Sequence, residues 1–419
     1  MARVSRFFEV LRRNWKKSLF GVAVLGYGVN YGKNIYETKQ LMREYCTLAS
    51  KYGDVPNPKL RRPRQITVIL NPAANKRKAK ELFEKYCAPL LNLAGLAVIV
   101  VQTEYAGHAK EIIDSLDPKT EAIVVAGGDG TVSEIITGLL RRIEDQSGAL
   151  KKLPMGVLPL GRSNSISLAL LGNREEVRAL ADATMAIIDG SLKTADVIKI
   201  EPIDAEGTSK PIYSLAQVEW GAFRDAQSKR DNYWVFGGLR DYVSYLFTNA
   251  QDDTWKAIYY EPCKGCSKCR VKNKENWKWW SFFIPRTRTP EKDYSNIINE
   301  NCGEPREKEF SSVEFAIQTS ILSKENDEAL DAPHLRMTIG ADNLGKFAFV
   351  REGWSRLWGI DSKPVETVNM RQIQLMKYGP KKEDDWLSID NEDFEVRPIK
   401  ISILPETINL FIPRASGYV

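Results

Sequence analysis

A buried strand that runs straight into a glycine turn constrains this chain more than any other feature of its sequence. The apolar run 122–126 leads into the turn Gly127, Gly128, Asp129, Gly130 and Thr131. Beyond the turn, apolar residues recur at helical spacing, at Val132, Ile135, Ile136, Leu139 and Leu140. Glycines let a backbone approach an anion closely, and the free N–H groups at a helix start point toward it. The segment predicts a parallel strand, a phosphate-binding turn and a helix; a tight turn capped by Asp129 is the alternative.

Two more loops of this kind are predicted, one on each side of the glycine turn in the sequence. Residues 64–70 form a predicted strand that ends in a loop from Asn71 to Asn75, before a basic helix that begins near Lys76. Residues 155–158 form another strand, which leads through a loop at 159–164 into a further helix. Ligands bind at the carboxyl edge of an open α/β sheet, where we expect all three loops to meet. The lysine signatures of the Walker and protein-kinase phosphate loops are absent.

The three loops resemble the catalytic domain shared by diacylglycerol, sphingosine and ceramide kinases. That family has Asn-Pro and usually a glycine in the first loop, Gly-Gly-Asp-Gly-Thr in the second and Pro-Leu-Gly-Thr-Gly-Asn in the third. This chain matches the second loop throughout, has Asn75 near the usual glycine of the first, and has Arg162 and Ser163 in place of Thr-Gly in the third. A departure in the third loop is a mark of the mitochondrial acylglycerol kinases. Further segments are similar to that branch: 14–17, 71–74, 82–85, 184–190 and 220–226.

The resemblance implies a site for ATP and Mg²⁺ built largely from these loops. It assigns nucleotide contacts to Asn71, Gly127, Gly128, Gly130, Thr131, Glu134, Gly161, Arg162, Ser163, Asn164, Arg240 and Asp390. In the third loop, the guanidinium group of Arg162 and the hydroxyl group of Ser163 are expected to bind phosphate in place of some backbone N–H groups. Asp390 is also expected to serve the metal through the ATP phosphates. A surface glutamate is the alternative for Glu134, and a solvated helix residue is the alternative for Arg240.

Catalysis is expected to depend on positioning and charge neutralisation, as phosphoryl transfer requires. A carboxylate would take the proton of the acceptor hydroxyl, and both Asp129 and Glu392 are candidates for this base. Residues 386–392 predict a strand entering a hairpin turn, with Asn391 where the family has glycine; Asn adopts positive φ more readily than most residues. The resemblance places Asp225 at the lipid head group, where it would orient a glycerol hydroxyl. An exposed loop carboxylate is the alternative.

The order of predicted elements changes near residue 194. Residues 62–193 alternate strands and helices and predict a Rossmann-like α/β nucleotide-binding domain with a parallel sheet. Residues 194–419 predict a mostly antiparallel β-sandwich, in which the resemblance implies that the lipid chains bind. Its strands are predicted at 194–200, 211–219, 256–260, 313–319, 335–339, 346–350, 366–376 and 399–412. A basic segment rich in Cys and Trp, at about 250–310, is expected to be an insertion.

The amino terminus is basic and contains few acidic residues, which is typical of a mitochondrial targeting segment. Residues 1–36 contain seven Lys or Arg and a single acid, Glu9. The apolar run 19–29 is shorter than the ~20 residues that span a bilayer, so surface attachment or shallow insertion is expected; a secretory signal peptide is the alternative. Residues 37–61 are predicted as a linker. The resemblance implies the inner mitochondrial membrane, facing the intermembrane space, and the net charge of +6 suits an anionic membrane surface.

The six cysteines include a doubled C-x-x-C motif at Cys263, Cys266 and Cys269. Three thiolates and a fourth ligand could bind zinc or an iron–sulfur cluster, and Cys302 is a candidate fourth ligand. Disulfides or free thiols are the alternatives. The sequence alone leaves these possibilities open.

The predicted function is transfer of phosphate from ATP to monoacylglycerol and diacylglycerol, which gives lysophosphatidic acid and phosphatidic acid. The resemblance also implies an alternative, a scaffold subunit of the translocase that inserts carrier proteins into the inner membrane, with or without kinase activity. Intact Asp129, Asp390 and Glu392 favour catalysis, because a pure scaffold has no need of carboxylates around a phosphate cleft. A sphingosine or ceramide kinase is less favoured. A nicotinamide nucleotide kinase is also less favoured, because segment 220–240 of this chain resembles lipid kinases. Nucleic-acid binding is not expected, because no segment resembles a nucleic-acid-binding motif.

Overall fold

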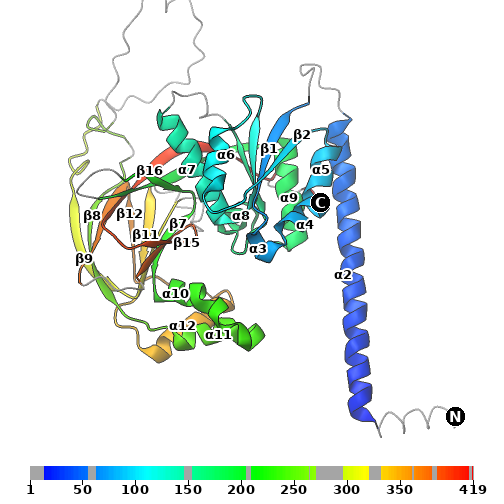
Figure 1. Cartoon of the computed structure of the whole chain (residues 1–419). Coiled ribbons are helices and arrows are strands. Elements are labelled where there is room, and N and C mark those ends of the chain that lie inside the picture. The colour runs from blue at the N-terminus through cyan, green and yellow to red at the C-terminus, as the bar shows by residue number, and fades with distance from the viewer. Residues whose placement is uncertain are drawn as a thin grey trace, which may run out of the picture.

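A parallel α/β half is followed by an antiparallel β half in this chain (Figure 1). The computed structural model describes residues 14–54, 63–145, 153–203, 209–263, 265–269, 296–319, 332–360, 363–379, 385–414 and 418. The fold class predicted from the sequence, an α/β nucleotide-binding part followed by a mostly antiparallel β-sandwich, is confirmed.

Parallel strands form the first part of the larger sheet. In spatial order they are β2 (Ala97–Gln102), β1 (Gln65–Leu70), β3 (Ala122–Gly127) and β4 (Met155–Pro159). All six residues of β3 are buried, and alternate residues of this strand enter two different apolar cores. A strand covered on both faces has no polar side, which is why its sequence is a continuous apolar run. Leu70 pairs with Ala126, so the loops after β1 and β3 begin at the same edge.

Helices provide the other side of both cores. One core contains residues of α4 (Ala79–Leu82), the π-helical turn η1 (Phe83–Cys87), α5 (Ala88–Leu93), α9 (Glu176–Asp189) and the end of α2 (Trp15–Gly53). The other contains residues of α6 (His108–Asp114) and α7 (Asp129–Asp145). The short helices α3 (Ala74–Arg77) and α8 (Ser165–Leu171) follow the loops after β1 and β4. Each of the three predicted phosphate loops therefore leads into a helix.

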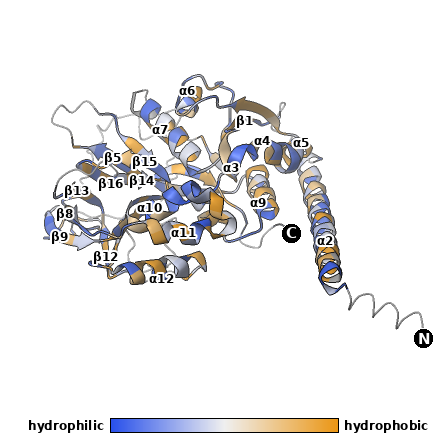
Figure 2. Cartoon of the chain, turned by 60° about the horizontal axis from the view of Figure 1, so that its bottom comes forward, coloured by the Kyte–Doolittle hydropathy of each residue, from blue (hydrophilic) through white to orange (hydrophobic). Residues whose placement is uncertain are grey.

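Helix α2 packs against the α/β half at one end and extends away from it at the other (Figure 1). Tyr45 is fully buried and its hydroxyl donates to Asp182 at 2.6 Å, while Tyr52 donates to Asp189 at 2.9 Å. These contacts make residues 37–53 helical, where the sequence analysis predicted a linker. Toward its amino end α2 exposes apolar side chains, among them Leu19, Phe20 and Leu25. Hydrophobic and hydrophilic residues alternate along the whole ribbon of α2 in Figure 2. Across the described residues, no helix has an apolar stretch long enough to cross a membrane; residues 1–13 and 55–61 lie outside them.

The second half packs two sheets around one core. The larger sheet continues from β4 through β16 (Ile399–Phe411), β13 (Gln372–Lys377), β8 (Asp253–Tyr260) and β9 (Arg306–Ser312), and β5 (Leu192–Pro202) pairs with β16 and β6 (Ile212–Ser214). The smaller sheet has the order β12 (Glu366–Met370), β11 (Leu335–Ile339), β10 (Glu314–Gln318), β7 (Gln217–Gly221), β14 (Trp386–Ile389) and β15 (Glu392–Glu395). Trp220 and Trp255 contact Phe315 between the sheets, with ring centroids 5.7 and 5.0 Å from it. Aromatic contacts of this kind add to the stability gained by burial.

Three predicted strands differ from the observed elements. The strand predicted at 346–350 was wrong, because these residues begin helix α12 (Lys346–Leu357), whose Phe349 packs against Phe223 and Tyr245. A five-residue apolar run does not distinguish a strand from a helix. The single strand predicted at 366–376 is two strands in different sheets, and the strand predicted at 211–219 is divided into β6 and β7. Helix α12 lies beside α10 (Ala222–Lys229) and α11 (Arg240–Phe247), which the 3-10 segment η3 (Arg230–Leu239) joins (Figure 1).

Candidate active site

A cleft of about 960 Å³ lies where the three predicted phosphate loops meet the β14–β15 turn and the η3–α11 segment. Most of the residues that the sequence predicted for the site line it: Asn71, Gly128, Asp129, Gly130, Thr131, Glu134, Gly161, Arg162, Ser163, Arg240 and Glu392. Gly127, Asn164, Asp225 and Asp390 are outside the lining. Segments as far apart in the chain as Asn71 and Glu392 thus build one site, as expected from the carboxyl edge of a parallel sheet.

The second and third loops touch each other through glycines. A Cβ atom on Gly161 would overlap the Cα atom of Gly128, and a Cβ atom on Gly130 would overlap the carboxylate of Glu392. Asn164 holds the third loop in shape, because its Oδ1 atom accepts from the Gly161 N–H at 2.8 Å. The glycines are therefore required by close approach between the loops and by the side chain of Glu392 as well as by any bound anion.

The first loop carries backbone strain. Asn75, Lys76 and Arg77 have φ values of 48, 54 and 68°, in the left-handed region that favours glycine. This explains why Asn75 can stand near the usual family glycine, since Asn tolerates that region. Asn71 fixes the start of the loop, because its Nδ2 atom donates to Thr131 Oγ1 at 3.0 Å and its Oδ1 atom accepts from the Ala73 N–H.

Replacing Lys76 with glycine should relieve part of this strain. We expect Lys76→Gly to raise the free energy of unfolding by about 0.5–1 kcal/mol, since the left-handed conformation costs a non-glycine residue roughly 1–2 kcal/mol and glycine loses part of that gain to chain entropy. Lys78→Gly is the matched control, because Lys78 also lines the cleft but has φ −91°. That control should lower stability. Urea unfolding measures both, and equal effects of the two substitutions would contradict the strain.

Asp129 is a buried carboxylate held by three donors. Its oxygens accept from the Ser165 and Ile166 N–H groups at 2.9 and 3.3 Å, and from Asn391 Nδ2 at 3.1 Å. Burial raises its pKa above the ordinary value, while these hydrogen bonds act in the opposite direction. Asp129 thus connects the glycine turn to the first turn of α8 and to the β14–β15 turn, and its oxygens are largely used by the protein.

Asp390 lies behind the cleft and organises its wall. The carboxylate accepts from Ser214 Oγ at 2.7 Å and from the backbone N–H groups of Leu215, Ala216 and Gln217 at 3.0–3.1 Å. Burial raises the pKa of Asp390 to about 6. A carboxylate offers about four acceptor positions, so these donors already use its capacity. The predicted contact between Asp390 and a metal stays a prediction; the geometry gives the residue a positioning role for the turn that presents Asn391 and Glu392.

Glu392 is a partly buried carboxylate that the cleft leaves available. Its side chain lies against Gly130, and within the described part of the chain no hydrogen bond or ion pair reaches its carboxylate. Burial raises its pKa, the nearby charge of Glu134 raises it further, and the charge of Lys110 acts in the opposite direction. Glu134 itself accepts from the Gly107 N–H at 2.9 Å, which ties α7 to the start of α6. A carboxylate with a raised pKa and free oxygens has the properties of a general base.

Basic side chains surround the mouth of the cleft. Arg162 forms an ion pair with Asp231, and Arg240 Nη1 lies 3.5 Å from the same carboxylate. Lys76, Lys78 and Arg230 also line the cleft. The sequence analysis assigned a role to Arg162 and Arg240 but missed Asp231, which holds the two arginines together. No local signal marked Asp231, because it lies 69 residues from Arg162 in the sequence and comes near both arginines only in the fold.

Asp225 is outside the cleft. It lies in the first turn of α10, where Arg224 Nη1 donates to its carboxylate at 2.8 Å, and Arg224 also pairs with Asp393 on β15. Burial raises the pKa of Asp225. This chain of charges connects α10 to the hairpin that carries Glu392, and the predicted contact of Asp225 with a lipid head group stays a prediction.

Comparison with known proteins agrees with the geometry. The model of the diacylglycerol kinase catalytic domain matches residues 65–200, and that of the acylglycerol kinase C-terminal region matches residues 215–417. The mitochondrial acylglycerol kinase of Xenopus laevis is 32% identical over 98% of this chain and 95% of its own length, and the human one is 30% identical over 97% and 96%. A putative diacylglycerol kinase from Bacillus anthracis str. Sterne shares the fold, with a TM-score of 0.54 at 16% identity over 86% of this chain and 99% of its own. The chain belongs to the acylglycerol kinase family and is a lipid kinase.

Proposed function

We propose that this lipid kinase transfers the γ-phosphate of ATP to monoacylglycerol and diacylglycerol, giving lysophosphatidic acid and phosphatidic acid. The observation that carries the proposal is the cleft, in which three strand-to-helix loops meet the available carboxylate of Glu392. The names of the vertebrate relatives, acylglycerol kinases, support a glycerolipid as the acceptor. Membership of a kinase family implies that the donor is ATP.

In this mechanism the protein contributes position and charge. The N–H groups at the start of α7 and the surrounding lysines and arginines bind the phosphate chain, and Glu392 takes the proton of the attacking lipid hydroxyl. Its raised pKa brings the base closer to neutral pH, where proton transfer is most efficient. Asp129 and Asp390 hold the loops and the β14–β15 turn in place around it.

The oxygen atoms of the cleft suit Mg²⁺. Thr131 and Glu134 line it and supply hydroxyl and carboxylate oxygens, which are the ligands that this ion prefers together with phosphate oxygens. These residues would hold the ion. When bound, Mg²⁺ neutralises charge on the transferred phosphoryl group.

Arg240 should contribute mainly to ATP binding. We expect Arg240→Gln to raise the KM for ATP by about 10–100-fold, because a charge-assisted hydrogen bond contributes roughly 1.5–3 kcal/mol, and to change kcat much less. Arg351→Gln is the control, since Arg351 is an exposed residue of α12 outside the cleft. Steady-state kinetics at varied ATP concentration measures both constants. An unchanged KM for ATP would show that Arg240 only pairs with Asp231.

An apolar surface beside the cleft suits an acceptor that lies in a membrane. The η3–α11 segment, which contributes Arg230, Asp231 and Arg240 to the cleft, also exposes large apolar side chains, as does α12 with the residues after it. They are Trp234, Val235, Phe236, Leu239, Leu246, Phe247, Phe347, Trp358 and Ile360. Exposed apolar side chains gathered on neighbouring elements are typical of interaction sites, and tryptophans are enriched at membrane interfaces. The lipid would reach Glu392 from this side.

The test is a panel of acceptors. Purified protein is incubated with magnesium, labelled ATP and vesicles that contain monoacylglycerol, diacylglycerol, sphingosine or ceramide, with Asp129→Ala protein as the control. We expect labelled lysophosphatidic and phosphatidic acid from the wild-type protein alone. Label in sphingosine or ceramide with none in the glycerolipids would overturn the acceptor class, and transfer to no lipid would overturn the proposal.

We also propose that the protein acts at the inner mitochondrial membrane, on the intermembrane-space side. Three observations support this location: the vertebrate relatives are named as mitochondrial proteins, the amino terminus is basic, and α2 exposes apolar residues. Partnership with the carrier-protein translocase is a separate possibility. It is tested by asking whether Asp129→Ala protein, which we expect to lack catalysis, still co-purifies with that complex.

A further inference from the structure

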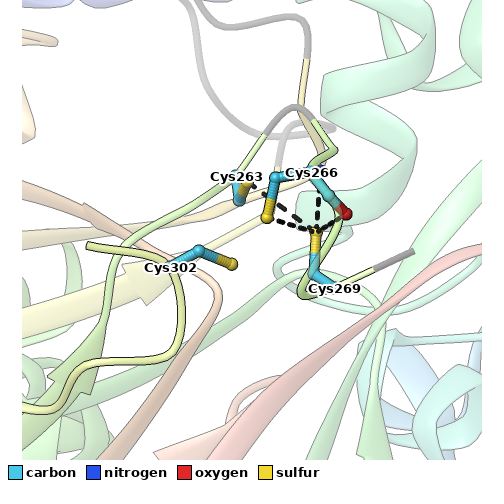
Figure 3. A group of neighbouring side chains, drawn as sticks. All are labelled: Cys263, Cys266, Cys269 and Cys302. Carbon is cyan, nitrogen blue, oxygen red and sulfur yellow. Dashed lines mark hydrogen bonds between the residues drawn. The ribbon is translucent and has the colours of Figure 1, made fainter. Parts of the chain in front are cut away.

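Four cysteines converge at the base of the connection between β8 and β9 (Figure 3). Cys263, Cys266 and Cys269 follow the end of β8, and Cys302 precedes β9 by a few residues. The two strands pair from Tyr259 and Arg306 onward, so the cysteines lie just beyond the last pair of the hairpin. The cluster is separate from the kinase cleft, none of whose lining residues it includes.

The spacing of the sulfur atoms matches one tetrahedral metal ion. The Cys269 Sγ atom lies 3.7 Å from Cys263 Sγ and 3.7 Å from Cys266 Sγ, and the four Sγ atoms all lie within 4.8 Å of one another. Zinc–sulfur bonds of about 2.3 Å in a tetrahedron place the sulfurs about 3.8 Å apart. The four thiols are free and partly or fully buried, with Cys266 the most buried.

Backbone and side-chain N–H groups hold the sulfurs from both sides. The Cys266 N–H donates to Cys269 Sγ at 3.3 Å, and Asn299 Nδ2 donates to Cys263 Sγ at 3.4 Å. The Ser267 N–H donates to the Ile297 carbonyl at 3.0 Å, which joins the two segments that carry the cysteines. Hydrogen bonds to metal-bound ligands orient them and stabilise their charge, so this is the outer shell that a thiolate site needs.

We propose that Cys263, Cys266, Cys269 and Cys302 bind one structural Zn²⁺ ion. Four thiolates in tetrahedral arrangement are typical of zinc sites that are closed to substrate. An iron–sulfur cluster fits less well, because its several irons lie between the cysteines and push the sulfurs farther apart. A disulfide fits less well, because Cys269 is equally close to two cysteines and no pair is distinguished. The ion would link the two ends of the connection between β8 and β9. Few of the described residues near the four cysteines are buried, so metal binding would supply stability that a hydrophobic core does not supply there.

Metal analysis of the full-length protein tests the proposal. Protein expressed with zinc in the medium and purified without chelator should contain one zinc per chain. Cys266→Ser and Cys302→Ser should each lose it, whereas Cys46→Ser, which changes a cysteine outside the cluster, should keep it. Replacement by Co²⁺ should give the thiolate charge-transfer and strong ligand-field absorption of a tetrahedral cobalt centre.

A second measurement avoids dependence on the folding of the variants. Titration of the wild-type protein with a thiol-modifying reagent should release one zinc per chain into a colorimetric indicator. Zinc in less than stoichiometric amount that added Zn²⁺ does not restore would overturn the proposal. So would a disulfide within the cluster found by mass spectrometry of freshly purified protein, or iron together with acid-labile sulfide.

Discussion

Glu392→Gln should remove most of the phosphoryl transfer, lowering kcat by about 10²–10⁴-fold, the range that a general base contributes. Glutamine keeps the size of the side chain that packs against Gly130, so the cleft keeps its shape and the KM for ATP should stay close to the wild-type value. Stability should also stay unchanged, because no described residue bonds to the Glu392 carboxylate. Initial rates with labelled ATP and a diacylglycerol vesicle measure the effect.

The pH dependence of kcat/KM in the wild-type enzyme should also show the ionisation of Glu392. Burial and the charge of Glu134 raise the pKa of Glu392, and a base acts only when deprotonated. The kcat/KM value should therefore fall as the pH falls through this raised pKa, at a higher pH than for an exposed glutamate. Glu392→Gln should lose this acidic limb, whereas Glu395→Gln, on the same strand β15, should keep it. An acidic limb that persists unchanged in Glu392→Gln would assign it to another group, such as Asp390.

The phosphate loops were predictable from sequence because each rests on local rules. A buried strand, a turn that needs glycine or Asn, and a helix follow one another within a few residues, as at Gly127–Thr131. The tolerance of Asn391 for positive φ was predicted in the same way, and its φ is 67°. The hydrogen bond from Asn391 to Asp129 was not predictable, because it joins residues 262 positions apart through two different sheets.

The errors have the same origin. Helix α2 continues through residues 37–53 because Tyr45 and Ala49 pack against the α/β core, a tertiary contact that local composition does not reveal. Residues 346–350 form a helix because Phe349 fits between Phe223 and Tyr245. For Asp390, the metal contact expected from the family pattern stays a prediction; what local sequence did not reveal is the set of donors to its carboxylate. The donors that occupy it come from the segment Ser214–Gln217, about 175 residues earlier in the chain.

Asp129→Asn should be as damaging as the loss of the base, for a structural reason. The substitution replaces one acceptor oxygen by an NH₂ group among three donors, from Ser165, Ile166 and Asn391. A buried donor left without an acceptor costs about 1–3 kcal/mol, so we expect a fall of that size in the free energy of unfolding. The same loss lets the glycine turn and the β14–β15 turn separate. A displacement of about 1 Å costs roughly 100-fold in rate, so kcat/KM should fall by at least about 100-fold.

The combination of the two losses distinguishes Asp129 from Glu392. Asp129→Asn should lower both stability and activity, whereas Glu392→Gln should lower activity alone. Asn391→Gly is the graded control, because it removes one of the three donors to Asp129 and restores the residue that the family has at this positive-φ position. Asn391→Gly should lower the free energy of unfolding by about 1 kcal/mol. It should also lower kcat/KM by roughly fivefold, which corresponds to the same energy in the transition state. Full stability of Asp129→Asn together with complete loss of transfer would contradict the positioning role and identify Asp129 as the base, since a group that only holds the loops cannot be removed without weakening the fold.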